Sequence, residues 1–121
     1  MTECGPLRML TDQRHSLAVN MGELRATRNG RPHYHRYTTE IYEVLAGSGC
    51  IRFQESGEEP QDISVAAGSL LVITPPTIHQ VRPCPGFGAY LLIEVTATPA
   101  WDRIDKYFLT TEKEAAFNAA L

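Results

Sequence analysis

Short runs of alternating hydrophobic and polar residues fill most of the chain, and Gly, Pro, Asn or Asp interrupts them about every eight to twelve residues. Val, Ile, Leu, Tyr and Phe are frequent in these runs, as is typical of half-buried strands. The pattern predicts strands at residues 6–10, 16–21, 23–28, 33–36, 40–46, 50–55, 62–66, 69–74, 79–82 and 88–96. Turn-forming residues separate them at 29–30, 47–49, 56–57, 67–68, 75–76 and 85–86. We therefore expect an all-β fold of antiparallel strands that close, or nearly close, into a barrel.

The C-terminal residues carry the one helical pattern. Thr111 followed by Glu114 matches a capping box, and the residues EAAFNAAL favour a short helix. Residues 97–108 before it are irregular, and we expect four of their side chains to pack on the barrel exterior: Trp101, Ile104, Tyr107 and Phe108. The sequence predicts a single domain over residues 1–121, with a barrel core at about 15–97 and a helical tail at about 101–121.

Composition excludes several classes of partner. Apolar residues make up 43% of the chain and charged residues 21%, as in an ordinary globular protein. The net charge is −3 and no run of Lys or Arg is long, so we expect no nucleic-acid partner. No segment approaches the roughly 20 apolar residues of a membrane span, and the first residues lack the apolar core of a signal peptide. We therefore expect no membrane partner and a cytoplasmic location.

The three cysteines, Cys4, Cys50 and Cys84, are widely spaced and form no C-x-x-C pair. This spacing argues against a disulfide framework or a zinc knuckle. We expect reduced thiols that behave as small buried hydrophobic residues.

Histidines and a glutamate suggest a metal site. His33 and His35 are two apart, so on a strand they share a face, with Cα atoms about 6.5–7 Å apart. Glu40 follows five residues after His35, and an odd separation on an unbroken strand sends a side chain to the opposite face. Residues 36–39 must therefore contain a bulge or short turn if Glu40 is to join the pair.

The fourth candidate is His79, which follows a Pro-Pro turn at the start of a strand. A lone H-x-H pair or a histidine after a turn is more often a surface feature, but together these residues use three of the four histidines, and His15 is left as a surface residue. Three imidazoles and one carboxylate suit a single divalent ion of Fe, Mn, Ni, Co or Zn. Octahedral coordination would leave two positions open, which is typical of a catalytic site.

The segment RPHYHRYTTEIYEVLAGSG, with Gly68 and His79 further on, resembles the two motifs of the cupin family. Departures from the family pattern are Thr74, Pro76 and Pro83, together with Gly30, which stands closer to His33 than in the family. The resemblance implies a jelly-roll β-barrel (a double-stranded β-helix), the metal ligands His33, His35, Glu40 and His79, and usually a homodimer. It implies no particular reaction, because cupins range from dioxygenases to storage proteins.

Three further side chains have open roles. Tyr42 shares a face with Glu40, so it either transfers a proton beside the metal or packs the barrel; the matching position is a catalytic tyrosine in some small cupin lyases. Arg52 either pairs with Glu43 on the outer face or turns inward opposite Val44, depending on the turn at 47–49. The direction of Glu94 on the last strand is not fixed by the sequence.

Two functions fit this sequence. The first is a metal-dependent enzyme, a dioxygenase, isomerase or lyase, whose small polar substrate chelates the metal at the open positions. Oxygen chemistry would need a redox-active ion, whereas isomerisation or lysis would need a Lewis acid and a base such as Tyr42. The alternative is a non-catalytic module that binds a small molecule or a sugar.

Overall fold

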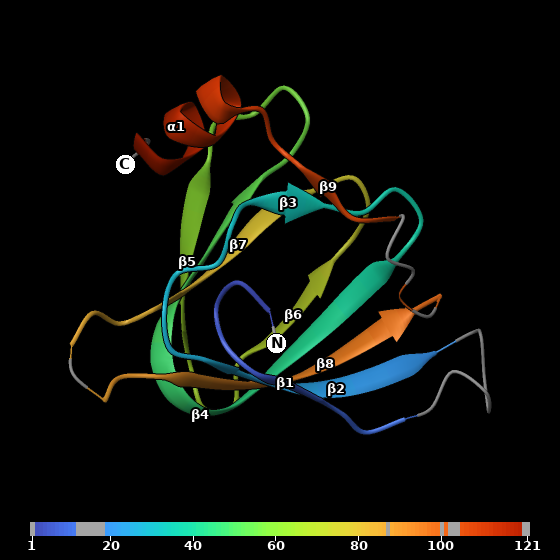
Figure 1. Cartoon of the computed structure of the whole chain (residues 1–121), viewed down its shortest axis with the longest axis vertical. Helices are drawn as coiled ribbons and strands as arrows, with labels where there is room; N and C mark the ends of the chain where they lie inside the picture. Colours follow the sequence, from blue (N-terminus) through green and yellow to red (C-terminus); the bar gives the residue numbers. More distant parts are fainter. Residues whose placement is uncertain (1, 12–18, 87, 100, 102–104, 120–121) are drawn as a thin grey trace.

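The computed structural model describes residues 2–11, 19–86, 88–99, 101 and 105–119, and these form one curled antiparallel sheet with a C-terminal helix (Figure 1). The elements are β1 (Leu7–Met9), β2 (Asn20–Ala26), β3 (His33–Tyr34), β4 (Thr39–Gln54), β5 (Gln61–Ala66), β6 (Leu70–Ile73), β7 (Ile78–Pro83), β8 (Leu91–Thr98), β9 (Tyr107–Phe108) and α1 (Thr111–Ala119). The strand order is β1-β2-β8-β4-β7-β3-β9, and β5 and β6 each pair with β4. The predicted barrel of short antiparallel strands is confirmed.

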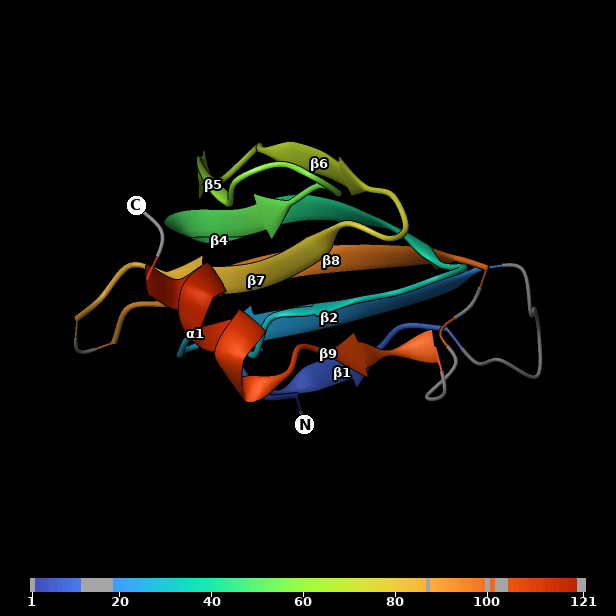
Figure 2. The same cartoon turned by 90° about the horizontal axis from the view of Figure 1, so that it is seen from above.

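The strand β4 connects the two halves of the barrel. Its first half pairs with β8 and β6, and its second half pairs with β7 and β5. A bulge lies between Val44 and Ala46, and Gly47 has a φ of 85°, a conformation that favours glycine. The turn predicted at 47–49 is therefore wrong: the bulge and glycine let the strand bend sharply and continue, as Figure 2 shows from above.

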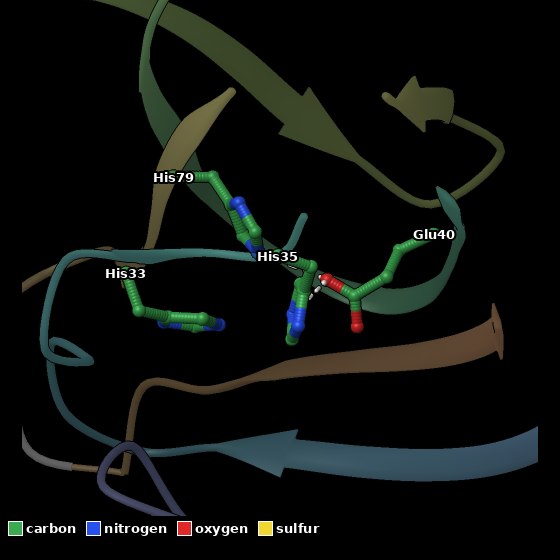
Figure 3. Close-up of side chains that lie close together, drawn as sticks. All are labelled: His33, His35, Glu40 and His79. Atoms are coloured by element: carbon green, nitrogen blue, oxygen red, sulfur yellow. Dashed lines mark ion pairs between the residues drawn. The ribbon is translucent and has the colours of Figure 1, made fainter. Parts of the chain in front are cut away.

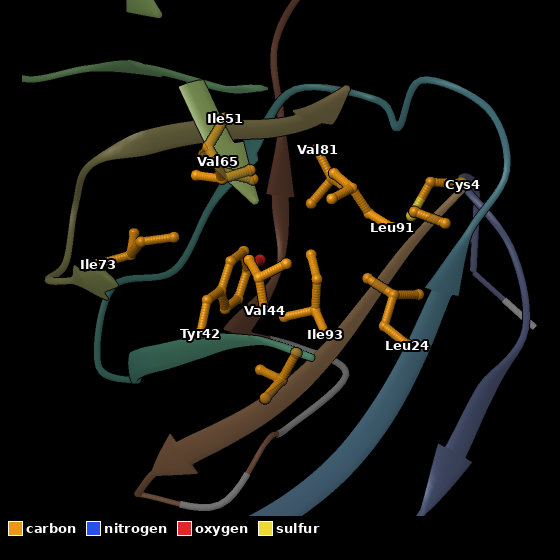
Figure 4. Close-up of a cluster of buried hydrophobic side chains, with 12 residues drawn as sticks. Cys4, Leu24, Tyr42, Val44, Ile51, Val65, Ile73, Val81, Leu91 and Ile93 are labelled. Atoms are coloured by element: carbon orange, nitrogen blue, oxygen red, sulfur yellow. The ribbon is translucent and has the colours of Figure 1, made fainter. Parts of the chain in front are cut away.

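Hydrophobic side chains from both halves meet inside this curl (Figure 4). Alternate residues of β8 are buried, beginning with Leu91, Ile93 and Val95, which is the period of two that the sequence shows. They face side chains of β4, β5 and β7 across the core. The intervening Glu94 therefore lies on the outer face, directly opposite Glu43.

Three local predictions differ from the structure. The strands predicted at 16–21 and 23–28 differ from β2, which begins at Asn20 and continues through Gly22; residues 16–18 lie outside the described residues. A Cβ at Gly22 would lie 2.9 Å from Leu7 Cδ1 on β1, so the glycine permits close packing between the two strands. The helix is capped by Thr110, whose Oγ1 accepts a hydrogen bond from the Lys113 backbone N–H at 3.3 Å, and Thr111 is already helical. The short strand β9 was not predicted.

Arg52 takes neither of its predicted positions. Its guanidinium is buried and makes two hydrogen bonds to the Asp62 carboxylate on β5, at 2.7 and 2.8 Å. Its Nη1 donates to the backbone carbonyls of Phe117 and Asn118, at 3.0 and 3.1 Å. Both predicted positions assumed a hairpin at 47–49. Without that hairpin, Arg52 lies opposite Asp62 and holds the end of α1 against the barrel.

The three cysteine thiols differ in their exposure to solvent. All three are free, but only Cys4 is buried; Cys50 is half-buried and Cys84 is exposed, so the expectation of burial is wrong for Cys84. Within the part of the chain that the structure describes, no helix is long and apolar enough to span a membrane.

Candidate metal centre

The four predicted ligands meet inside the barrel (Figure 3). Their ligand atoms all lie within 4.8 Å of one another. His33 on β3 lies directly opposite His79 on β7, while His35 follows β3 and Glu40 is the second residue of β4. His35, Glu40 and His79 are buried, and His33 is half-buried.

A bend at Arg36 and Tyr37 brings Glu40 to the histidines, as the odd spacing predicted. The carboxylate of Asp105 holds this bend: it accepts hydrogen bonds from the backbone N–H groups of residues 36, 37 and 38, at 2.8, 3.1 and 3.1 Å. Burial alone would raise the pKa of Asp105, but these donors lower it below its usual value. Asp105 was not predicted as a site residue, because in the sequence it is marked only as an acidic residue in the irregular segment 97–108.

Each imidazole is oriented by a backbone carbonyl. The contacts are His33 Nδ1 to Arg31 O at 3.0 Å, His35 Nδ1 to Asp105 O at 2.7 Å and His79 Nδ1 to Thr77 O at 3.0 Å. A carbonyl oxygen only accepts hydrogen bonds, so each neutral ring donates from Nδ1 and leaves the lone pair on Nε2. This is the tautomer that binds a metal through Nε2.

Glu40 is oriented by Trp101, whose indole Nε1 donates to Oε2 at 2.9 Å. The prediction that Trp101 packs on the exterior is therefore wrong: its ring packs against the hydrophobic core and its N–H points at Glu40. The other oxygen, Oε1, lies 2.9 Å from His79 Nε2 and 3.3 Å from His35 Nε2.

These short contacts are not hydrogen bonds: with the ring proton on Nδ1, Nε2 and the carboxylate Oε1 both carry lone pairs and neither can donate. Glu40 Oε1 and the Nε2 atoms of His35 and His79 are buried and have no hydrogen-bond partner among the described residues. Unpartnered buried polar atoms carry a substantial free-energy cost. A divalent ion at their point of convergence would satisfy all of them, so the residues present fit such an ion.

Charges inside the cluster shift several pKa values. Burial disfavours the imidazolium of His35, but the Glu40 carboxylate outweighs burial and raises the pKa of His35. Burial also acts against the charge of Glu40, yet His35 and His79 hold the pKa of that carboxyl well below its usual value. The pKa of His33 is well below its usual value because of burial, His79 and Lys106. Without a metal, the Glu40 carboxylate therefore favours the protonated form of His35.

Tyr42 lies beside this cluster, on the inner face as predicted. It is 4% exposed, and its ring centroid is 6.3 Å from that of His79. Burial and the Glu40 carboxylate raise the pKa of the phenol well above its usual value, so the hydroxyl keeps its proton. Its catalytic role remains a prediction.

Aromatic residues of β9 lie on both faces of the sheet edge. Phe108 pairs with His33 and shares its face, with ring centroids 6.0 Å apart, and it stays 38% exposed at the sheet edge, as a residue on the exterior does. Tyr107 stacks on Tyr34 at 5.2 Å on the outer face, as expected. Ile104 and His15 lie outside the described residues.

A separate pocket of about 370 Å³ lies between α1, the β4–β5 turn and the loop before β7. Gln54, Pro76 and Phe117 are among its lining residues, and none of the four clustered ligands lines it. The metal-ligand chemistry is therefore not in this pocket.

Comparison with known proteins identifies the fold. No protein-family model and no curated protein matches the sequence. The structure resembles Pac13, a nucleoside dehydratase of Streptomyces also solved with uridine, with a TM-score of 0.71 and 14% identity over 93% of this chain and 87% of that one. A protein from Planctomyces limnophilus has a TM-score of 0.69 and 23% identity over 88% of this chain and 84% of that one. A predicted oxalate decarboxylase from Thermotoga maritima has a TM-score of 0.63 and 18% identity over 76% of this chain and 77% of that one. The chain has the cupin fold, a jelly-roll β-barrel with a short C-terminal helix.

Proposed function

We propose that this protein is a metal-dependent enzyme whose small polar substrate binds at one divalent ion held by His33, His35, Glu40 and His79. The observation that carries the proposal is the convergence of buried ligand atoms that lack hydrogen-bond partners, each on a side chain oriented from behind. The reaction would be that of a dioxygenase, an isomerase or a lyase, since the fold alone does not choose between them. One protein of similar fold is a nucleoside dehydratase, and dehydration is a lyase reaction, so lyase substrates are the first to screen.

The donor set defines what the site can do. Three neutral imidazoles and one carboxylate leave a divalent ion with a net positive charge, and the bound ion supplies Lewis-acid polarisation of a substrate oxygen. The backbone carbonyls behind the histidines and the Trp101 indole behind Glu40 fix the ligand directions. Preorganisation of this kind is needed to orient a chelated substrate.

Tyr42 is the candidate group for proton transfer. Its hydroxyl is buried next to Glu40 and His79, away from bulk water. A positioned phenol can donate a proton to a leaving group or take one from a substrate. The competing role is packing, because the Tyr42 ring also belongs to the hydrophobic core.

Metal analysis tests the proposal. The purified protein is offered Fe, Mn, Ni, Co or Zn, and we expect about one ion per chain to be retained for at least one of them. His79→Ala should lower metal affinity strongly. Val81→Ala, which removes a buried side chain from the same strand without touching a ligand, should cost stability but keep the ion. The proposal fails if the wild type retains no metal, or if both variants retain it equally.

A turnover screen with the loaded protein then separates an enzyme from a binding module. Small acids, sugars and nucleosides are suitable candidates, and an enzyme converts at least one of them. A non-catalytic module would bind a ligand at the metal and release it unchanged.

The proposal extends to assembly and location. We expect a homodimer, because β1 and β6 each have one edge without a partner strand among the described residues and carry exposed apolar side chains, such as Met9 at 45% and Leu70 at 67%. We expect a cytoplasmic location, where an exposed free thiol such as Cys84 stays reduced.

A further inference from the structure

Two cations lie against one aromatic ring at the edge of the ligand cluster. The Arg31 guanidinium carbon is 4.3 Å from the Phe108 ring centroid, and Lys106 Nζ is 5.2 Å from it. That ring lies 6.0 Å from the His33 ring. A cation on an aromatic face is held in place without losing its charge.

The register of the strands places this group on the same side as the metal ligands. Phe108 and His79 both pair directly with His33, and directly opposed residues of antiparallel strands share a face. A similar pair serves as a comparison on the other face: Arg36 lies 4.5 Å from the ring of Tyr107, which pairs with Tyr34. The chain thus carries cation–aromatic contacts both beside the site and behind it.

A carboxylate of the chain itself already occupies the position beside these cations. Glu3 contacts Lys106 Nζ through both oxygens, at 3.0 and 3.2 Å. Burial opposes the charge of Glu3, but Lys106 and Arg31 help to hold its pKa below the usual value. Arg31 also makes one contact through Nε with Glu114, at 3.4 Å.

These ion pairs are exchangeable. The Lys106 and Glu3 side chains are 30% and 35% exposed, and the Arg31 and Glu114 side chains are 46% and 27% exposed. Pairs of this exposure contribute little to stability, because water screens them. An incoming anion can therefore replace Glu3 beside Lys106 and Arg31 at small cost.

We propose that Arg31 and Lys106, held on Phe108 beside His33, bind a carboxylate of the substrate while other polar groups of the same molecule occupy the metal, and that Glu3 competes for this position. The inference rests on the proposed function, since it names the class of its substrate: a small acid with a carboxylate beyond the chelating group. The charges of the site favour an anionic substrate, because the metal-loaded cluster is positive and the two cations add to that charge.

Calorimetric titration of the metal-loaded protein tests the subsite with three 2-hydroxy acids that share one chelating group. Lactate has only that group, whereas malate and 2-hydroxyglutarate add a second carboxylate at two distances. We expect at least one of these dianions to bind about tenfold more tightly than lactate, as for a charge-assisted pair. Lys106→Gln and Arg31→Gln should each remove most of this difference and leave the affinity for lactate within about twofold.

Glu3→Gln should change the affinity for the dianion in the opposite direction. Removal of the competing carboxylate should tighten the binding of the dianion several-fold and leave lactate unchanged. Arg36→Gln, which alters the matching pair on the outer face, should change neither ligand. Two results would overturn the subsite: equal affinity of the wild type for all three acids, or no effect of Lys106→Gln and Glu3→Gln on the affinity for the dianion. In either case, binding of metal and lactate would still support the metal centre. Failure of the wild-type protein to retain a metal would overturn the proposed function, and the subsite with it, whereas failure of the loaded protein to bind any of the three acids would overturn the subsite alone.

Discussion

The indole N–H of Trp101 donates to Glu40 Oε2 at 2.9 Å, which leaves Oε1 directed toward His35 and His79. The two residues are 61 positions apart, so the chain after β8 returns to fix the rotation of a carboxylate at the start of β4. Trp101 is thus a positioning residue for the candidate metal ligand.

Trp101→Phe should therefore weaken metal binding. The ring that packs on the core is largely kept, while the donor to Glu40 is lost and the carboxylate can rotate. We expect the metal affinity to fall about 10–100-fold, as for other residues that orient a ligand. Competition with a chromophoric chelator measures this change. Tyr34→Phe, on the outer face beside the ligands, is the control, and equal affinities of the two variants would contradict the positioning role.

Tyr42→Phe tests proton transfer. The variant keeps the ring and removes only the hydroxyl, so the metal content and the fold should be unchanged. We expect the turnover of a substrate found by screening to fall about 10²–10⁴-fold. Full turnover by the variant would assign Tyr42 to packing alone and leave the metal centre unaffected.

The stabilisation that a metal provides should increase with pH. Glu40 raises the pKa of His35, so below that value a proton occupies the position that the metal needs. Thermal unfolding with and without the ion, from about pH 5.5 to 8, measures the difference. A metal-induced shift in Tm that is the same at every pH would contradict competition between the proton and the ion.

Above about pH 6.5, where His33 is neutral in both the folded and the unfolded chain, the metal-free protein should show the reverse trend. The raised pKa of His35 contributes stability that is fully present below about 6.5, its unfolded value, and is lost as pH rises through the folded value. The lowered pKa of Glu40 contributes stability that is present above about 4.3 and is lost as pH falls through its folded value. The pair therefore stabilises the metal-free protein most between these limits, and Glu40→Gln should flatten the profile in urea unfolding.

Asp105→Ala should destabilise the bend before β4. Three backbone N–H groups at 36–38 lose their acceptor, and a lost buried acceptor costs about 1–3 kcal/mol. Since the bend directs Glu40, metal affinity should fall together with stability. Denaturant titration measures the first effect, and Glu23→Gln, at a more exposed ion pair, should cost less than about 1 kcal/mol. A loss of stability without any loss of metal affinity would separate Asp105 from the site.

Light scattering over a range of concentrations tests the homodimer. We expect twice the mass of one chain at micromolar concentration. A mass of one chain that does not change with concentration would refute it.

The sequence was informative wherever one physical rule acts over a few residues. A period of two predicted that alternate residues of β8 share a face, although only the structure shows which face is buried, and the odd spacing between His35 and Glu40 required the bend that the structure contains. The same rules failed at Gly47, because a left-handed glycine is compatible both with a hairpin and with a strand that continues through a bulge. Only the partner strands decide between them.

Such local rules do not predict contacts between residues that are far apart in the sequence. Asp105 meets the backbone of Arg36 across 69 positions, and Arg52 meets the end of α1 across 65. The path of the whole chain decides which backbone groups an irregular segment contacts. Periodicity carries no information about that path. The cluster of four candidate ligands was predictable because the motifs of the family that the sequence resembles fix their spacing, whereas the residues that orient them have no such local spacing.

The strand β4 has partner strands on both edges at residues 40–43 and 49–53, and it carries Glu40 at one end and Arg52 at the other. Neither half of the barrel can separate from it without breaking the sheet. In hydrogen–deuterium exchange, the amides of β4 should open only with global unfolding, while those of β9 and α1 should exchange through smaller local openings. The candidate metal centre thus has its carboxylate on the slowest-exchanging strand and His33 on the two-residue β3, next to β9, where local opening admits exchange with solvent.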